Sequence, residues 1–226
     1  MWSKEDRAQA TVSGPIAVNS IVGRATQIDT VGGSSKYVSW PTSTRFDLPS
    51  SGSTLALVAR LAGTVSAEYC RIFHRDIKTI PPAESYGFLI TTAGDKNGAP
   101  YGYFAGTNVG YTLASGQLSS TIFERLVIQH DGTNATFWRN GTAVETVAIS
   151  TPASSALTMR IGAHSGPAFG ANVDVEMAFV DGRRWTNAEI IAWSKNKYSI
   201  FAPIPSRRYF FSAGAAGDVL MAQACL

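Results

Sequence analysis

The sequence predicts an all-β protein, an antiparallel two-sheet sandwich with one short helix near the C-terminus and extended arms at both ends. Three observations lead to this fold class. Short runs of alternating apolar and polar residues recur along the chain. Turn-forming residues separate these runs about every 8–12 residues, as in two-sheet β sandwiches. Hydrophobic residues make up 45% of the 226 positions, which is enough for a sizeable core.

The predicted organisation has three parts. Residues 1–35 are polar, small and weakly patterned, so we expect an extended N-terminal arm with Trp2 as an anchor. Residues 36–196 are expected to form the sandwich. Residues 197–226 are expected to form a tail, in which prolines block regular structure and the C-terminus is strongly apolar. Such a tail either covers one end of the sandwich or packs on another subunit.

The first half of the sandwich contains five predicted strands. They cover residues 37–40, 54–61, 68–74, 85–92 and 101–105. Each is a short run rich in apolar, β-branched or aromatic residues, which are the types that fit a pleated and partly buried surface. The turn-rich stretch TAGDKNGAP separates the last two strands.

Two hairpins are predicted in the second half, around the turns Asp131-Gly132 and Asn140-Gly141. A strand ending at Gly162 comes next, followed by a strand with clean alternation. In the latter, one set of side chains should face the core and the other the opposite surface. The predicted core set is Val173, Val175, Met177 and Phe179, and the outer set is Asn172, Asp174, Glu176 and Ala178.

A short helix is expected to follow these strands. The stretch Thr186-Asn187-Ala188-Glu189 fits a capping box. In this motif the Thr hydroxyl and the Glu carboxylate each accept from a backbone N–H that the first helical turn leaves unpaired.

The order of these elements resembles the C-terminal half of a laminin-G-like, concanavalin A-type jelly roll. The matching residues are Phe123, Asp131-Gly132, Trp138-Arg139-Asn140-Gly141, Ile161-Gly162, Asp174 and Glu189-Ile190. The resemblance implies a jelly-roll sandwich, but this fold carries lectins, hydrolases and purely structural modules. The stretch IFAP…RRYFF after the helix also resembles the ends of laminin-G-like proteins encoded by tailed bacteriophages and prophages.

Composition restricts the classes of function. Charged residues make up 15% of the chain, against about 25% in typical soluble domains. Such a surface suits a module that neighbours cover or that is displayed outside a cell. The net charge of +3 is too small to argue for a nucleic-acid or membrane partner. Neither a signal peptide nor a membrane span is expected, and Cys70 and Cys225 are expected to stay unpaired.

One strand resembles a catalytic motif. Laminarinase-type glycoside hydrolases carry their carboxylates as E-x-D-x-E on one strand, with the first Glu as nucleophile and the last as acid/base. Here the corresponding positions are Asn172, Asp174 and Glu176, and an amide cannot act as the nucleophile. We therefore predict that the protein is not an enzyme.

A calcium site is the one cofactor that the resemblance raises, because laminin-G and pentraxin relatives often bind Ca²⁺ at one rim. Asp131, Asp174 and Asp181 are the candidate ligands. No dense acidic loop accompanies them, so the prediction is that no cofactor is present.

Two kinds of binding surface are predicted. Basic residues next to aromatic residues suggest a protein–protein interface, with solvated turn residues as the alternative. Its candidate members are Trp2, Arg183, Arg184, Trp185, Arg207, Arg208, Tyr209, Phe210 and Phe211. A sugar platform would need exposed aromatic rings with polar neighbours, and Tyr101, Tyr103 and Tyr111 are the candidates.

The functional prediction is a non-enzymatic virion structural protein of a tailed phage, specifically a capsid decoration or cement protein. It would assemble in the host cytoplasm as a homo-oligomer that binds the major capsid protein or tail proteins. The alternative is a carbohydrate-binding module of a tail fibre or adhesin. A degenerate glycoside hydrolase is a third hypothesis.

Overall fold

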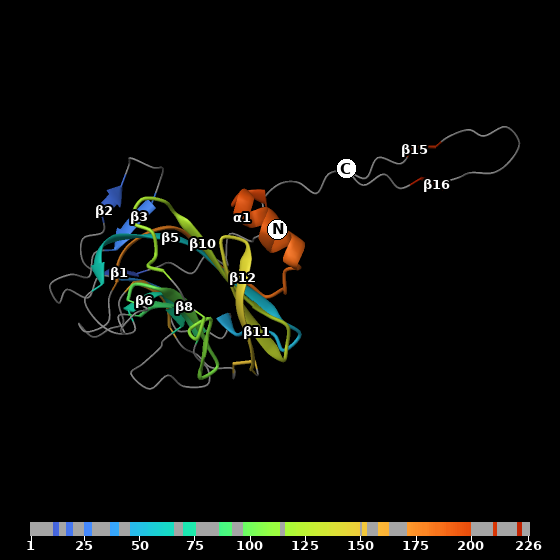
Figure 1. The fold of residues 1–226 in the computed structure, drawn as a ribbon, viewed down its shortest axis with the longest axis horizontal. Coiled ribbons are helices and arrows are strands. Elements are labelled where there is room, and N and C mark those ends of the chain that lie inside the picture. The colour runs from blue at the N-terminus through green and yellow to red at the C-terminus, as the bar shows by residue number, and fades with distance from the viewer. Residues whose placement is uncertain are drawn as a thin grey trace, which may run out of the picture.

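Two antiparallel sheets lie face to face in the computed structural model (Figure 1). The structure describes residues 11–13, 17–19, 25–28, 37–40, 46–65, 70–75, 86–91, 97–113, 116–149, 151–152, 158–162, 171–199, 210–211 and 221–222. The first sheet has seven strands, in the spatial order β1 (Thr11–Ser13), β4 (Tyr37–Ser39), β13 (Met159–Gly162), β6 (Cys70–Arg75), β7 (Tyr86–Ile90), β8 (Pro100–Phe104) and β9 (Thr107–Val109). The second sheet also has seven, in the order β12 (Thr142–Ala148), β11 (Asn134–Arg139), β10 (Glu124–His130), β5 (Ser53–Val65), β14 (Ala171–Asp181), β3 (Ala25–Ile28) and β2 (Ala17–Asn19).

This arrangement confirms the predicted all-β, two-sheet antiparallel sandwich with one short helix, α1 (Asn187–Lys195). Strands that are distant in sequence pair antiparallel, such as β5 with β14 and β6 with β13. The chain therefore crosses repeatedly between the sheets, as a jelly roll requires. No helix in the described ranges is long and apolar enough to cross a membrane.

The N-terminal segment corrects the predicted domain boundary. Strand β1 pairs with β4 in the first sheet, while β3 pairs with β14 and β2 in the second. Strands β1, β2 and β3 all lie before residue 36, so the described part of the expected arm belongs to the sandwich. Hydropathy periodicity missed them because each strand has only 3 or 4 residues. At the other end, β15 (Phe210–Phe211) and β16 (Met221–Ala222) pair with each other and with neither large sheet.

The main core fills the space between the two sheets. Large apolar side chains from both inner faces meet there, and most of them are fully buried; they include Leu55, Leu57, Phe88, Phe104, Leu126, Ile128 and Phe137. The side chain of Cys70 is buried in the same cluster. Cys225 lies outside the described residues.

Strand β14 reverses its faces partway along, which corrects the predicted alternation. Val175 pairs with Ala59 and Met177 with Val58, so Glu176 is an extra residue without a partner on β5. Such a bulge moves every later side chain to the other face. Val173 and Val175 join the core between the sheets as predicted, but Met177 and Phe179 face outward.

Helix α1 covers those outward residues. Ile190 and Trp193 of the helix pack with Trp185 on Met177, Phe179 and Val58, forming a second apolar cluster on the outer face of the second sheet. Phe179, Trp185 and Trp193 make ring contacts with centroids 5.4 to 6.1 Å apart. The predicted capping box is confirmed: the Glu189 amide donates to the Thr186 hydroxyl, and the Glu189 carboxylate accepts from the Thr186 amide.

Both predicted hairpins are present in the second sheet. Asn140 and Gly141 have φ values of 51° and 82° between β11 and β12, and Gly132 has a φ of 101° between β10 and β11. Positive φ at two successive turn residues matches the right-handed twist of the paired strands, which explains the Asn-Gly sequence.

Candidate functional site

The predicted sugar platform is not exposed. Tyr101 and Tyr103 of β8 are buried and pack with Leu89 of β7, while Tyr111 contacts Tyr101 edge-on at 5.1 Å. Burial raises the pKa of Tyr103 to about 12. Tyr101 and Tyr103 therefore belong to a small apolar cluster and do not form the predicted sugar-binding surface. Tyr111 lies at the edge of this cluster and is partly exposed.

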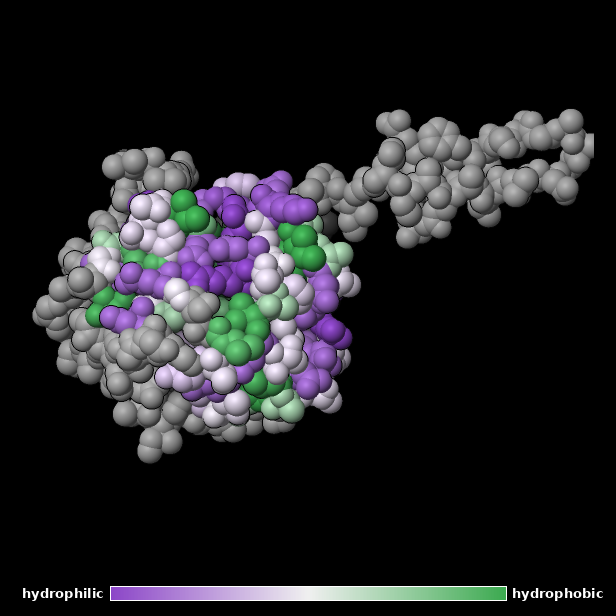
Figure 2. All heavy atoms as spheres, in the orientation of Figure 1, coloured by the Kyte–Doolittle hydropathy of each residue, from purple (hydrophilic) through white to green (hydrophobic). Residues whose placement is uncertain are grey.

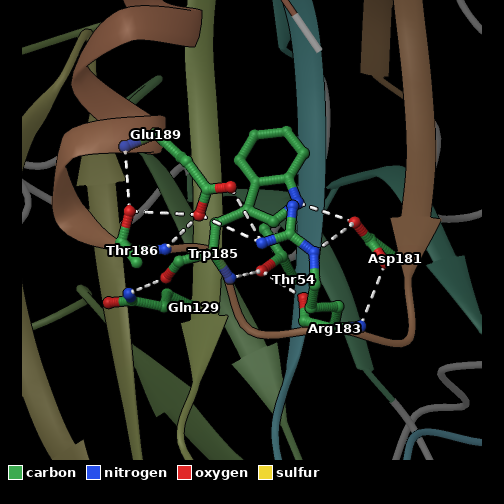
Figure 3. A network of polar contacts seen from close by, with 7 residues as sticks. All are labelled: Thr54, Gln129, Asp181, Arg183, Trp185, Thr186 and Glu189. Atoms are coloured by element: carbon green, nitrogen blue, oxygen red, sulfur yellow. Dashed lines mark hydrogen bonds and ion pairs between the residues drawn. The ribbon is translucent and has the colours of Figure 1, made fainter. Parts of the chain in front are cut away.

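Trp185, predicted at a partner interface, instead anchors the loop that leads into α1 (Figure 3). Its side chain is only 1% exposed. The indole N–H donates to Asp181 Oδ2 at 2.7 Å, and the backbone N–H donates to Thr54 Oγ1 at 2.9 Å. The Trp185 carbonyl accepts from the side-chain amide of Gln129 on β10. This residue is therefore unavailable to a partner protein because the sandwich itself buries it.

Arg183 belongs to the same loop and forms an ion pair with Glu189 of the helix. Its guanidinium lies 2.9 and 3.1 Å from the two carboxylate oxygens of Glu189 (Figure 3). Burial raises the pKa of Glu189, but the Thr186 amide and the Arg183 guanidinium outweigh it and lower the pKa below its ordinary value. Arg183 thus stabilises the start of α1, and this exposed pair contributes little energy.

The rest of the predicted interface is dispersed or outside the described residues. Arg184 is exposed and makes no ion pair or hydrogen bond within the part of the chain that the structure describes. Phe210 and Phe211 form β15, whose side chains are not described. Trp2, Arg207, Arg208 and Tyr209 lie outside the described residues.

The three candidate calcium ligands lie apart, and each has other partners. Asp131 Oδ1 accepts from the amides of Thr133 and Asn134 in a tight turn. The first of these bonds is the main reason why its pKa falls to about 2. Asp174 pairs with Arg60, and Asp181 accepts from Trp185. Among the described residues no group of three or more His, Cys, Asp or Glu side chains gathers to hold a metal ion.

Each carboxylate of the catalysis-like strand faces a cation. Arg60 Nε donates to Asp174 Oδ2 at 2.7 Å, and this carboxylate is almost fully buried. The Lys197 ammonium donates to Glu176. The guanidinium of Arg60 also stacks over the Phe123 ring, 4.9 Å from its centroid. These charge pairs form a neutral strip along the outer face of β14.

An exposed aromatic ring stands where this strip meets the end of α1. The Tyr198 side chain is 58% exposed, and the Lys197 ammonium lies 5.2 Å from its ring centroid. Asn196, the C-cap of the helix, donates from its backbone to Ala192 O and accepts from the Tyr198 amide at 3.0 Å. This turn fixes the position of Tyr198 relative to the helix. Figure 2 shows one face of the molecule, on which apolar residues form separate patches within a mainly polar surface.

Unpaired acceptors lie along the same strand. The Oδ1 atoms of Asn172 and Asp174 are buried and accept no hydrogen bond. We define the strip site as Asn172, Asp174, Glu176, Arg60, Lys197 and Tyr198. It combines an exposed ring, two buried unpaired acceptors and two charge pairs.

Sequence reasoning missed Tyr198 as a site residue. The aromatic residue directly after the helix was a usable signal, but nothing in a sequence shows which of many aromatic rings remain exposed. The sequence pattern places Glu176 only in a catalysis-like motif. Its pairing with Lys197 joins residues 21 positions apart, which no local pattern predicts.

No protein-family model and no curated protein matches this sequence. Among solved structures, the receptor-binding domain of botulinum neurotoxin D is similar, with a TM-score of 0.61 and 10% identity over 84% of this chain and 48% of that one. The binding domain of botulinum neurotoxin DC, in complex with SialylT, has a TM-score of 0.56 and 10% identity over 83% of this chain and 46% of that one. The sialidase of Trypanosoma rangeli, in complex with the inhibitor DANA, has a TM-score of 0.58 and 14% identity over 84% of this chain and 30% of that one.

These similarities define the class of protein as a jelly-roll-like β sandwich. The chain spans less than half the length of each of these structures. At this identity the similarity establishes the fold alone.

Proposed function

We propose that the protein is a non-enzymatic glycan-binding module, and that the strip site at the end of α1 holds the sugar. The observation that carries the proposal is the exposed Tyr198 ring beside the Lys197–Glu176 pair, on a strand that also carries the unpaired Oδ1 atoms of Asn172 and Asp174. An aromatic face covers the apolar side of a sugar ring, and the partly exposed Lys197–Glu176 pair offers hydrogen-bonding groups to its hydroxyls.

Two structural neighbours support this proposal at the level of the fold. The neurotoxin DC binding domain was solved in complex with SialylT, and cell entry of botulinum neurotoxin type C depends on interaction with two ganglioside molecules. Of the alternatives considered from the sequence, carbohydrate binding therefore has more support than a capsid role.

The test is binding of the full chain to a panel of immobilised neutral and acidic oligosaccharides. Tyr198→Ala should weaken binding about tenfold or more, because it removes a large contact surface. Tyr198→Phe should retain most of the affinity, since the ring remains. Leu113→Ala is the matched control, because Leu113 is equally exposed and lies in another loop. Absence of binding across the panel would refute the proposal, and equal binding by Tyr198→Ala would move the site elsewhere.

The non-enzymatic part rests on the charge pairs. A retaining hydrolase needs two carboxyl groups about 5–5.5 Å apart, one of them a free nucleophile. Here Asn172 occupies the first position, and Asp174 and Glu176 are engaged by Arg60 and Lys197. The protein should release no reducing sugar from β-glucans, and Glu176→Gln should make no difference. Turnover that this substitution abolishes would establish an enzyme.

A virion structural role is the second candidate, as a decoration or cement protein of a tailed phage that binds capsid or tail proteins as a homo-oligomer. Its support is the resemblance of the IFAP…RRYFF stretch, the low content of charged residues and the unpaired Arg184 on the surface. Quantitative mass spectrometry of purified particles separates the two candidates. A decoration protein is present in hundreds of copies per particle, whereas an adhesin is present in few.

A further inference from the structure

Four buried hydrogen-bond donors without partners belong to the C-terminal half of α1 and to the strands β10 and β11. The indole Nε1 atoms of Trp138 and Trp193, Nε of Arg125 and Oγ of Ser194 are all buried and have no partner. The residues Trp138, Trp193 and Ser194 are 6%, 0% and 9% exposed. Buried polar groups are almost always hydrogen-bonded, so four unpaired groups in one region require an explanation.

The topology places these residues on the same outer face of the second sheet and on the helix that covers it. Val127 pairs with Trp138 across β10 and β11, and Arg125 lies two residues before Val127 on the same outer face. The Arg125 amide donates to Asn140 Oδ1 at 2.9 Å, which ties it to the β11–β12 turn. A Cβ atom on Gly141 of this turn would lie 3.0 Å from Cβ of Ser194. Trp138 and Trp193 belong to the same apolar cluster.

The chemistry of the unpaired groups selects the ligand. Indole and guanidinium N–H groups donate and cannot accept, so the missing partner must bring acceptor oxygens. Arg125 carries a positive charge, and its planar fork matches a carboxylate. Among the described arginines, Arg60, Arg139 and Arg183 each have a carboxylate partner, Asp174, Glu124 and Glu189 respectively, whereas Arg125 has none. Arg125 is partly exposed although its Nε is buried, so another part of its side chain reaches the surface.

We propose that Arg125, at the exposed edge of the donor cluster that it forms with Trp138, Trp193 and Ser194, binds the carboxylate of an acidic sugar. The proposal rests on the proposed glycan-binding function and specifies its substrate class as glycans with a sialic or uronic acid. Lys197 and Tyr198 follow the same helix end, only 3 and 4 residues after Ser194. The sugar carboxylate binds Arg125, and the neighbouring sugar contacts Tyr198.

The experiment compares each acidic oligosaccharide with its neutral counterpart, such as a sialylated and a desialylated form, by calorimetry on the full chain. Arg125→Gln should weaken binding of the acidic form about tenfold or more, because a charge-assisted bidentate pair is lost, and should leave the neutral form unchanged. Arg125→Lys should restore part of the loss, since charge returns without the fork. Arg184→Gln is the control, because that arginine is also exposed and unpaired but precedes the other end of α1.

The outcomes separate the two proposals. Acidic and neutral forms that bind wild type equally, or that weaken equally in Arg125→Gln, would overturn the acidic preference and leave glycan binding intact. If neither form binds, the proposed function fails. In that case free sialic acid tests the carboxylate site directly. A change in tryptophan fluorescence that Arg125→Gln abolishes would support the site, because Trp138 and Trp193 border it, and no change would refute it.

Discussion

At the scale of single residues, most polar side chains with resolved partners stabilise the fold rather than perform chemistry. The bidentate contact of Arg139 with Glu124, at 2.5 and 2.8 Å, is typical. Arg139 also donates to the carbonyls of Gly116 and Gln117, so this pair fastens the loop before β10 to the hairpin. The residues that stand out against this background are those left unpaired, above all Arg125.

Thr186→Ala removes the hydroxyl acceptor of the capping box. The substitution should lower the free energy of unfolding by about 1 kcal/mol, the usual value of an N-cap. Thermal denaturation followed by circular dichroism measures the loss. Ile191→Ala, on the exposed side of the same helix, is the comparison. A Thr186→Ala protein with wild-type stability would show that the cap contributes nothing.

Glu124 should make stability depend on acidity. Burial raises its pKa, but hydrogen bonds from Arg139, Ser119 and Asn140 outweigh this and hold the pKa below the ordinary value of 4.5. A carboxyl group with a lowered folded-state pKa contributes stability that is complete above its unfolded pKa and is lost as the pH falls through the folded value. Urea unfolding should therefore show a loss of stability below about pH 4.5.

Glu124→Gln should flatten this acid dependence and lower stability at neutral pH, because Arg139 loses its ion pair. Glu145→Gln is the control, since Glu145 accepts one amide bond from Thr112 at the surface and should keep the wild-type dependence. An unchanged acid profile in Glu124→Gln would exclude this carboxyl group as the cause.

At the scale of elements, α1 and the β11–β12 hairpin pack against each other. The hairpin turn needs Asn140 and Gly141 in left-handed conformations, and the helix packs directly on that turn. The bulge at Glu176 then turns Met177 and Phe179 toward the helix. A local irregularity in one strand thereby creates the apolar surface on which the helix docks.

Gly141→Ala combines backbone strain with a steric contact, because φ is +82° and the new Cβ would lie 3.0 Å from Ser194. We expect the backbone conformation to lower the free energy of unfolding by about 1–2 kcal/mol. The contact with Ser194 should lower it further. Gly116→Ala isolates the first effect, since its φ is +70° and its nearest neighbour is 3.9 Å away. Chemical denaturation should find Gly141→Ala the less stable variant. Equal losses would mean that the helix moves aside freely.

Trp193→Ala tests the docking of the helix itself. Removing this buried ring should cost about 3–5 kcal/mol, as for large-to-small substitutions in a core. Ile191→Ala, on the exposed side of the same helix, should change stability by less than about 0.5 kcal/mol. Guanidinium unfolding measures both. Similar values for the two variants would contradict a docked helix.

At the scale of the whole molecule, the two large sheets account for the described N-terminal strands but not for the C-terminal pair. β1, β2 and β3 complete the edges next to β4 and β14, whereas β15 and β16 pair only with each other. The described N-terminal strands therefore belong to the sandwich, whereas the described C-terminal strands pair with neither large sheet. Composition alone does not reveal this difference.

Deleting residues 1–30 should destabilise the sandwich, because it removes three strands and leaves unpaired backbone groups along β4 and β14. Deleting residues 207–226 should leave the β spectrum and the unfolding transition unchanged. Circular dichroism with thermal melting measures both truncations. A fully stable protein without residues 1–30 would restore the interpretation of that segment as a separate arm.

The sequence by itself determined the fold class, both hairpins and the helix start. These features depend on local chemistry: Asn-Gly tolerates positive φ, and a Thr and a Glu three residues apart satisfy the first helical amides. The tertiary structure alone decided which aromatic rings are exposed and which charges are paired. Tyr101 and Trp185 are buried, Tyr198 is exposed, and Arg125 lacks the carboxylate that Arg60 has. Burial and pairing depend on contacts between residues distant in sequence, and the bulge at Glu176 changes the facing of its strand without a signature in the pattern.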